Sequence, residues 1–325
     1  MAISKETAEA HIQDWKTKLA RTRYPFTAKW PARIFRHDPL ENIALILNSG
    51  QILSRNDSGD QAPVDAAASS VLASNNQAHT KVRMYFRPRT PTQYRMEGIR
   101  KVTDIWEGAH APTIAMMMFD AKALLTREGC SYSTCNMQST DAEIGASDDF
   151  FTTKMNFSKT YHFGPHDNDS TITLRRCAEL LLPSPLEISS VLQHVYCRSP
   201  AEREYLLSML NDDVRSNWKA KILISDDMKV FDRRFAYVEV ATISSQAFYF
   251  KLHPRKDNSP IQVQLIVKSL SSGETIIANN YPALESSTQN WKIEQSFDPG
   301  DYLVTIALEN HRAYHSTISY QEVPF

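Results

Sequence analysis

A short segment between residues 81 and 101 concentrates groups that could do chemistry in this 325-residue chain. It holds seven basic residues and one acid, a local net charge of +6 in a chain whose total is −1. The basic residues are Lys81, Arg83, Arg87, Arg89, Arg95, Arg100 and Lys101, interleaved with Tyr85, Phe86 and Tyr94. Cations that neutralise phosphate and aromatic faces that stack on bases suit a polyphosphate or a single-stranded nucleic acid. The alternative is a solvated strand edge whose charges limit aggregation.

Glu179 is the second candidate, because it stands in an apolar stretch that includes Cys177, Ala178 and residues 180–182. A carboxylate in such a stretch is unusual unless it has a partner or a function. There it could stabilise a cationic transition state or accept a proton. The alternative is that Glu179 points to solvent from an alternating strand.

Glycines are scarce, and this excludes the standard nucleotide-binding loops. The chain has 9 glycines, and the closest two, Gly50 and Gly59, are nine positions apart. The Rossmann and Walker A loops need clustered glycines so that backbone amides can approach phosphate. If this protein binds a nucleotide, side chains must hold its phosphates.

The remaining composition indicates a globular protein of the cytoplasm. The four cysteines, Cys130, Cys135, Cys177 and Cys197, form no CxxC pair, which favours reduced buried thiols over a disulfide or a metal site. No apolar run approaches the roughly 18 residues that span a membrane. The N-terminus has no apolar signal region, which argues against secretion. We therefore expect no metal and no membrane partner.

Local patterns predict the elements that must position these groups. Ala8, Ile12, Trp15 and Leu19 recur at helical spacing, and a second helix follows Pro39 and ends at Gly50. Residues 54–80 are expected to form a long loop with a helical stretch near 64–73, and residues 139–170 to be irregular. Strands are expected at 81–86, 113–119, 175–182, 188–196 and 221–225, with helices after Asp120 and, from a capping box, after Ser199.

After about residue 230 the pattern changes to seven short runs of strand character within about 95 residues. Turn sequences such as 257–260, 271–273 and 298–300 separate several of them, which is typical of a β-sandwich. The sequence thus predicts an α+β protein in three parts. These are an N-terminal helix (1–30), an α+β domain (31–228) and an all-β sandwich domain (229–325).

Four separated segments together resemble the DarT family of NAD-dependent ADP-ribosyltransferase toxins, which modify bases in nucleic acid. They are IFRHDPLENIALILNSGQILSRN (34–56), VRMYFRPRTPTQY (82–94), PTIAMMMFDAKALLTREG with SYSTCN (112–136), and RRCAELLLPSPLEISSVLQHVYC (175–197). The second segment is the most specific, and KILISDD (221–227) is similar to the family's final strand. The resemblance covers roughly residues 33–228. It implies an ADP-ribosyltransferase-like split β-sheet and NAD as co-substrate.

The resemblance also implies roles for individual residues. Glu179 matches the catalytic glutamate, Arg89 a phosphate clamp in the catalytic machinery, and Tyr85 a face for nicotinamide or ribose support. Tyr94 and Asn42 match further residues of the NAD cleft, although Tyr94 could be core and Asn42 could brace its helix. The early NAD-contacting role could pass to Arg36 or His37, because the motif departs there from the family pattern. The family's loop arginine has no counterpart, since residues 56–80 contain no Arg or Lys; Arg55, Arg83 or Arg87 could replace it.

The implied function is ADP-ribosylation of a base in single-stranded DNA or, as in the CmdT branch, in mRNA. By analogy, the resemblance implies an antitoxin partner within a toxin–antitoxin or phage-defence system, with assistance from a chaperone, and the β-sandwich could dock such a partner. Two other classes compete with this one. One is an inactive module that binds nucleic acid, and the other is a transferase that modifies proteins.

Overall fold

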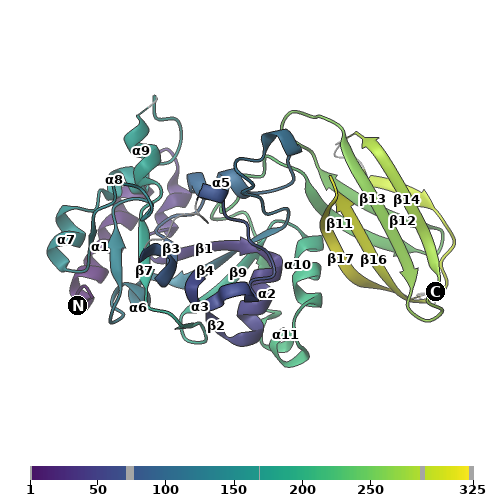
Figure 1. The fold of residues 1–325 in the computed structure, drawn as a ribbon, viewed down its shortest axis with the longest axis horizontal. Helices are drawn as coiled ribbons and strands as arrows, with labels where there is room; N and C mark the ends of the chain where they lie inside the picture. The colour runs from purple at the N-terminus through teal and green to yellow at the C-terminus, as the bar shows by residue number, and fades with distance from the viewer. Residues whose placement is uncertain (1, 71–76, 168, 286–289, 322–325) are drawn as a thin grey trace.

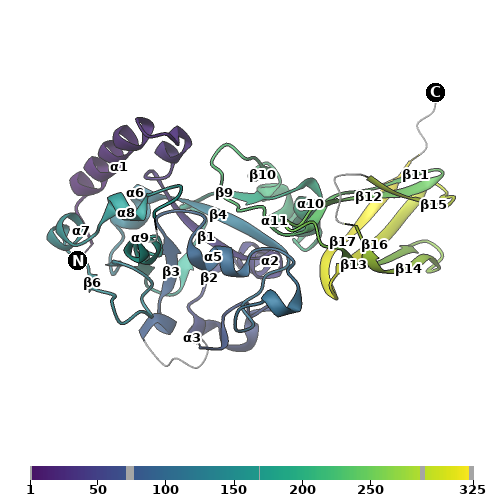
Figure 2. The same cartoon turned by 90° about the horizontal axis from the view of Figure 1, so that it is seen from above.

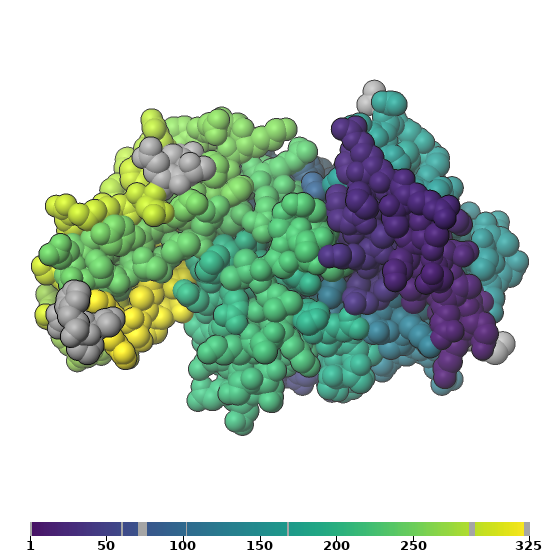
Figure 3. Space-filling model, turned by 180° about the vertical axis from the view of Figure 1, so that it is seen from behind, coloured from purple at the N-terminus to yellow at the C-terminus, as the bar shows by residue number. Residues whose placement is uncertain are grey.

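The computed structural model describes residues 2–70, 77–167, 169–285 and 290–321. Helices and a large sheet make up one end of the molecule, and strands alone make up the other (Figure 1). Helix α1 lies on the surface at the end away from the β region (Figure 3). The predicted α+β class is confirmed. In the described part of the chain, every helix is too short or too polar to cross a membrane.

The large sheet has eight strands in the order β10-β9-β4-β1-β3-β7-β5-β6. Its strands are β1 (Arg33–Pro39), β3 (Val82–Tyr85), β4 (Ile114–Asp120), β5 (Ser131–Ser133), β6 (Ile144–Gly145), β7 (Glu179–Leu182), β9 (Leu192–Cys197) and β10 (Ile222–Ile224). Its pairings are antiparallel apart from β9 with β10. Strands β1 and β3 meet at the Phe35–Tyr85 pair, where the two halves of the sheet join.

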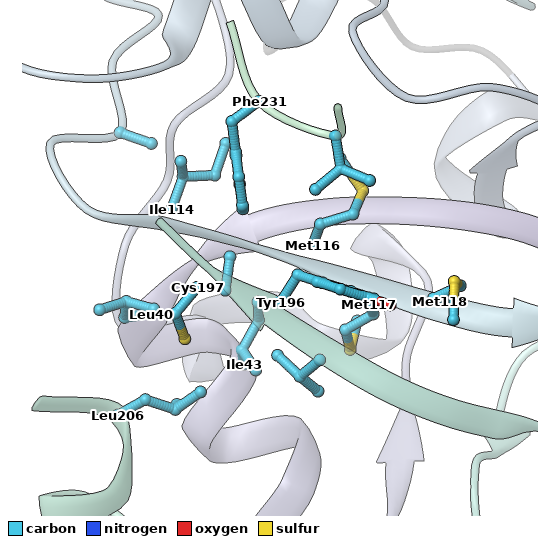
Figure 4. Close-up of a cluster of buried hydrophobic side chains, with 14 of the residues drawn as sticks. Leu40, Ile43, Ile114, Met116, Met117, Met118, Tyr196, Cys197, Leu206 and Phe231 are labelled. Carbon is cyan, nitrogen blue, oxygen red and sulfur yellow. The ribbon is translucent and has the colours of Figure 1, made fainter. Parts of the chain in front are cut away.

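Strand β4 is the centre of the core because both of its neighbours, β1 and β9, cover it along its length. Its apolar run without alternation fits burial on both faces. Figure 4 shows part of this core, including Leu40, Ile43, Ile114, Met116, Met117, Met118, Tyr196, Cys197, Leu206 and Phe231. All of these side chains are buried.

The predicted helices form, and polar caps set their ends. Helix α1 (Lys5–Ala20) buries Ala8 and Leu19, and α2 (Leu40–Ser49) ends at Gly50, whose φ is +74°. Helix α6 (Ala121–Leu125) is capped by Asp120, and α10 (Pro200–Ser208) by Ser199. Shorter helices are α3 (Arg55–Ser58), α5 (Pro91–Met96), α7 (Asp148–Thr153), α8 (Phe157–Thr160), α9 (Ser170–Arg175) and α11 (Asp212–Trp218).

Three local predictions need correction. Of the helical stretch expected near 64–73, residues 69–70 are helical, residues 64–68 are not, and residues 71–73 lie outside the described part of the chain. The stretch 139–170 is not irregular throughout, since it contains β6, α7 and α8. The strand expected at 175–182 begins at Glu179, because Asp169 accepts a hydrogen bond from the Thr171 N–H and starts α9 upstream of it. Short polar caps therefore determined where helices begin in stretches with weak apolar periodicity.

The C-terminal region contains the seven predicted strands in two sheets, β11-β12-β15 and β14-β13-β16-β17. They are β11 (Tyr237–Ser244), β12 (Ala247–His253), β13 (Ile261–Ser269), β14 (Thr275–Leu284), β15 (Asn290–Glu294), β16 (Gly300–Leu308) and β17 (His311–Tyr320). Alternate residues of β13 and β16 are buried, as expected for strands with one face in a core. Figure 2 shows the two sheets as separate layers. A further short pair joins β2 (Gln51–Ile52) to β8 (Leu186–Glu187).

Candidate active site

A cavity of about 840 Å³ opens beside the join between β1 and β3. Segments far apart in the sequence line it: β1, α2, residues 53–68 and 78–81, β3, α5, residues 106–109, the loop after β5, and α9 with Cys177. Its walls include Arg36, His37, Asp38, Asn42, Arg55, Val64, Asp65, His79, Lys81, Arg83, Tyr85, Thr92, Arg95, Trp106, Asn136 and Cys177. This volume falls within the range of about 300–1,000 Å³ that is usual for ligand sites.

Glu179 is fully buried directly behind this cavity. It is the first residue of β7, in register with Tyr85 of β3 and Ser133 of β5. One carboxylate oxygen accepts hydrogen bonds from Arg83, 2.6 Å from Nη2 and 3.2 Å from Nε. The other accepts one from the Met137 N–H at 2.8 Å. Glu179 therefore does not point to solvent; both of its oxygens are held in place.

Arg83 connects Glu179 to the cavity. Its Nη2 also donates to Asn136 Oδ1 at 2.8 Å, and its side chain lines the cavity wall. Burial alone would lower the pKa of Arg83, but the Glu179 carboxylate outweighs this and raises that pKa above its usual range. The pair is thus a positive guanidinium at the cavity surface with its counter-charge behind it.

Tyr85 and His37 form a neutral aromatic wall. Their rings are stacked with centroids 5.4 Å apart and planes at 10°. Burial lowers the pKa of His37 to about 4, so this imidazole is neutral at physiological pH. Burial and the charge of Glu179 raise the pKa of the Tyr85 hydroxyl above its usual range. These two rings therefore give the cavity an uncharged aromatic surface beside Arg83.

Arg36 and Asn42 brace the far side of the cavity. Arg36 forms an ion pair with Asp38 at 2.7 Å and donates to the Arg83 carbonyl at 3.3 Å. Asn42 donates to the Val64 carbonyl at 2.8 Å and accepts from the Val64 N–H at 3.0 Å. Asn42 therefore ties the 53–68 segment to α2 while also lining the cavity.

Two of the expected site residues lie elsewhere. Among the described residues, the cavity walls include neither Arg89 nor Tyr94. Arg89 pairs with Asp232 at 3.0 Å, and its guanidinium lies 4.9 Å from the ring centroid of Phe163. Tyr94 is 39% exposed on a different face of α5 from its neighbour Arg95, which does line the cavity. Glu179, Tyr85, His37, Arg36 and Asn42 are thus brought together, and Arg89 and Tyr94 are not.

The three arginines that could replace the missing loop arginine, Arg55, Arg83 and Arg87, lie in different surroundings. Arg83 contacts Glu179, and Arg55 lines the cavity while paired with Asp65 at 2.7 Å. Arg87 is buried elsewhere, with its guanidinium 4.9 Å from the Trp30 ring centroid, and burial lowers its pKa to about 9. Arg83 is therefore the arginine placed to act with the carboxylate.

Other cavity residues escaped the sequence analysis: His79, Trp106 and Asn136. Trp106 is 39% exposed and stacks on Arg95, whose guanidinium lies 4.1 Å from the ring centroid. A large exposed aromatic residue in a polar loop was the available signal for it. Asn136 lay within a recognised segment but carries no pattern of its own. Among the described residues, no group of three or more His, Cys, Asp or Glu side chains is placed to hold a metal.

Comparisons with known proteins fit the region that holds this cavity. A family model named DarT, described as ssDNA thymidine ADP-ribosyltransferase, matches residues 35–230. No curated protein sequence matches the chain.

Solved structures similar to this chain include three from two bacteria. Thermus sp. 2.9 DarT in complex with ADP-ribosylated ssDNA has a TM-score of 0.48 and 14% identity, over 61% of this chain and 96% of that chain. The same protein in complex with NAD+ has a TM-score of 0.47 and 14% identity, over 61% and 97%. Thermosipho africanus DarTG in complex with ADP-ribose has a TM-score of 0.47 and 15% identity, over 65% and 53%.

Proposed function

Because the chain belongs to the DarT family of ADP-ribosyltransferases, we propose that it transfers ADP-ribose from NAD to a base of single-stranded nucleic acid. One observation carries the assignment of the site: the buried Glu179, fixed by Arg83 and the Met137 N–H behind a cavity of about 840 Å³. A buried carboxylate held beside a large cavity is typical of a catalytic group.

The chemistry of the cavity suits NAD. Basic side chains that could neutralise its phosphates outnumber the acidic ones among the lining residues; they are Arg36, Arg55, Lys81, Arg83 and Arg95. The stacked His37 and Tyr85 offer a neutral surface for the nicotinamide ring. Side chains take the place of a glycine-rich phosphate loop, in agreement with the scarcity of glycine.

The reaction requires an anion near the ribose. NAD supplies a positively charged nicotinamide that leaves with the electron pair of its bond to ribose, and an atom of the nucleic acid base forms the new bond to the same carbon. The Glu179 carboxylate stabilises the positive charge that develops on the ribose. It also accepts the proton that the attacking base loses. Arg83 positions this carboxylate and presents its own charge to the phosphates.

The acceptor and the biological setting are further parts of this proposal. Single-stranded DNA is the first acceptor to test because the family description names it, and mRNA is the second. Modification of nucleic acid would be toxic to the cell that makes the enzyme. We therefore infer an antitoxin partner and a role in the cytoplasm, where NAD and the acceptor are both present.

The test is one incubation of labelled NAD with single-stranded DNA, duplex DNA, RNA and an unrelated protein, side by side. The variant is Glu179→Gln, which keeps the shape and removes the charge. The control is Glu294→Gln, the same change at an exposed site on β15. We expect the wild type and the control to label a single-stranded acceptor, and Glu179→Gln to label it at least about 100-fold more slowly.

Each other outcome has a defined meaning. Equal labelling by Glu179→Gln and wild type would remove Glu179 from the chemistry. Label on the protein acceptor alone would support the protein-modifying alternative. No label on any acceptor, with retained binding of nucleic acid, would support the inactive binding module.

A further inference from the structure

A second cavity, of about 320 Å³, lies where the C-terminal strands meet the helix–sheet region. Five basic residues and one aromatic residue line it: Arg100, Lys101, Arg234, Phe235, Arg255 and Lys256. Its acids are Asp104 and Asp257. The loop after α5 provides one wall, and the segments before β11 and β13 provide the others. This junction cavity is separate from the site of Glu179.

Aromatic rings and guanidinium groups contact one another here, where Phe235 lines the cavity and Tyr94 lies outside its lining against Arg100 and Arg234. Tyr94 is 39% exposed, and the guanidinium groups of Arg100 and Arg234 lie 5.4 Å and 5.3 Å from its ring centroid. Arg100 also lies 4.0 Å from the ring centroid of Phe235. Stacked aromatic and cationic groups of this kind bind single-stranded nucleic acid, because the rings stack on bases and the cations contact the backbone.

Some of the basic residues at this cavity form no ion pair within the described part of the chain. Lys101 lies 3.6 Å from Asp257, and Arg255 forms an ion pair with Glu309. Within residues 2–70, 77–167, 169–285 and 290–321, no ion pair involves Arg234 or Lys256. In the same ranges the buried Nε of Arg100 has no hydrogen-bond partner. Arg234 and Lys256 are therefore available to an external anion, whereas the Nε of Arg100 is buried.

The backbone holds the junction cavity in place. Ile99 and Ala236 form an antiparallel bridge between its walls, and the Lys256 N–H donates to the Arg234 carbonyl at 2.9 Å. Gly98 has φ +79°, and a Cβ there would lie 2.6 Å from Cβ of Phe235. The two walls thus approach so closely that only glycine fits. The basic and aromatic groups are preorganised rather than carried on a free loop.

Residues of α5 line the active-site cavity, and the loop that follows α5 lines the junction cavity. Arg95 and Trp106 are stacked at the wall of the active-site cavity, while Tyr94, the residue before Arg95, belongs to the junction side. Arg100 donates to the Tyr94 carbonyl, which links the two groups. Cations and aromatic rings therefore follow one another from the active-site cavity to the junction.

We propose that the junction cavity binds the single-stranded nucleic acid substrate beyond the modified base. Arg234 and Lys256 contact its phosphates, and Tyr94 stacks on a base. This proposal rests on the proposed function, and it assigns the C-terminal strands a part in holding the substrate. It also gives Tyr94 a role in place of the NAD contact that the family resemblance implied.

The test is the affinity of the full-length protein for a fluorescent 20-nucleotide single strand, measured by anisotropy at several salt concentrations without NAD. The variant is Arg234→Glu with Lys256→Glu. The control, Lys268→Glu with Lys292→Glu, makes the same change in net charge at exposed positions on β13 and β15. Because Lys268 is near the end of β13 and Lys256 precedes its start, the control lies away from the junction. Tyr94→Ala is a third, neutral variant.

We expect the junction variant to bind at least about tenfold more weakly, with the slope of log affinity against log salt reduced by about 1.4 for two lost phosphate contacts. Tyr94→Ala should bind about fivefold more weakly or worse, and the control should bind like the wild type. Equal loss in the control, no loss in the junction variant, or equal affinity for duplex DNA would each overturn the proposal. Because binding needs no NAD, a wild type that transfers nothing still tests this surface.

Discussion

At the scale of single residues, the contact between Arg83 and Glu179 is the central feature of the candidate active site. Arg83 donates to Glu179 through Nε and Nη2, and Nη2 also donates to Asn136. The family's loop arginine has no equivalent in residues 56–80. We propose that strand β3 supplies the cation instead, through Arg83, which lies two positions before Tyr85 on the same face.

The variant Arg83→Lys tests whether Arg83 takes the role of the missing loop arginine. A lysine is a point charge that cannot bridge Glu179 and Asn136 in the same way, so we expect transfer to fall by at least about tenfold. The measurement is the rate of label transfer from NAD, with Arg21→Lys on the exposed end of α1 as control. Transfer at the wild-type rate by Arg83→Lys would show that any cation at this position suffices.

At the scale of elements, α10 joins the two parts of the molecule. Its cap, Ser199, accepts from the Glu202 N–H and donates to the Val238 carbonyl of β11 at 2.6 Å. One helical turn holds a fully buried ion pair, Arg198 with Glu202. Tyr314 of β17 donates to Glu204 on the same helix. The helix that begins at this capping box thus forms hydrogen bonds with strands β11 and β17 through its polar side chains.

Glu202→Gln should be strongly destabilising, because it leaves the charge of Arg198 buried without its partner. We expect a loss of about 3–5 kcal/mol in the free energy of unfolding, measured with urea. The double variant Arg198→Met, Glu202→Leu removes both charges and should lose less than Glu202→Gln alone. A double variant as unstable as the single one would mean that the ion pair stabilises the fold beyond mutual neutralisation.

At the scale of the whole molecule, the sequence-based boundary at residue 229 falls within a set of buried contacts. Glu97 accepts hydrogen bonds from the N–H groups of Asp232 and Arg233, at 3.1 Å and 3.0 Å, and from Gln93. Trp30 donates to the Met228 carbonyl at 3.1 Å. We propose that the all-β part has the strand topology of a separate domain, but that its contacts stabilise the rest of the chain.

A chain of residues 1–228 tests this support. It would leave the Glu97 carboxylate without its two backbone donors and expose the face of α10 that packs on β11 and β17. We expect it to melt well below the full-length protein, or to be insoluble, in a thermal unfolding experiment. An equal melting temperature would contradict the proposal and show that the helix–sheet region is self-sufficient.

Local signals made much of the fold predictable from sequence. The stripe of α1, Gly50 after α2, the capping box before α10 and the seven C-terminal strands are patterns within a few residues, and each forms as expected. The strand expected at 113–119 also forms, as β4 at Ile114–Asp120. Motif order was enough to indicate the DarT family, and the family comparison confirmed it.

The sequence by itself therefore determined the family and those elements that carry strong local signals, because such signals depend on neighbours along the chain. Only the tertiary structure decided which of the similar basic residues meets the carboxylate. Arg83, Arg87 and Arg89 lie in one segment. Strand register pairs Tyr85 with Glu179, so that Arg83, two residues earlier on the same face, can donate to Glu179, while Arg87 and Arg89 are held by distant partners. Tyr94 likewise faces the junction because contacts with Arg100 and Arg234 lie there. Such pairings depend on long-range packing that no local pattern encodes.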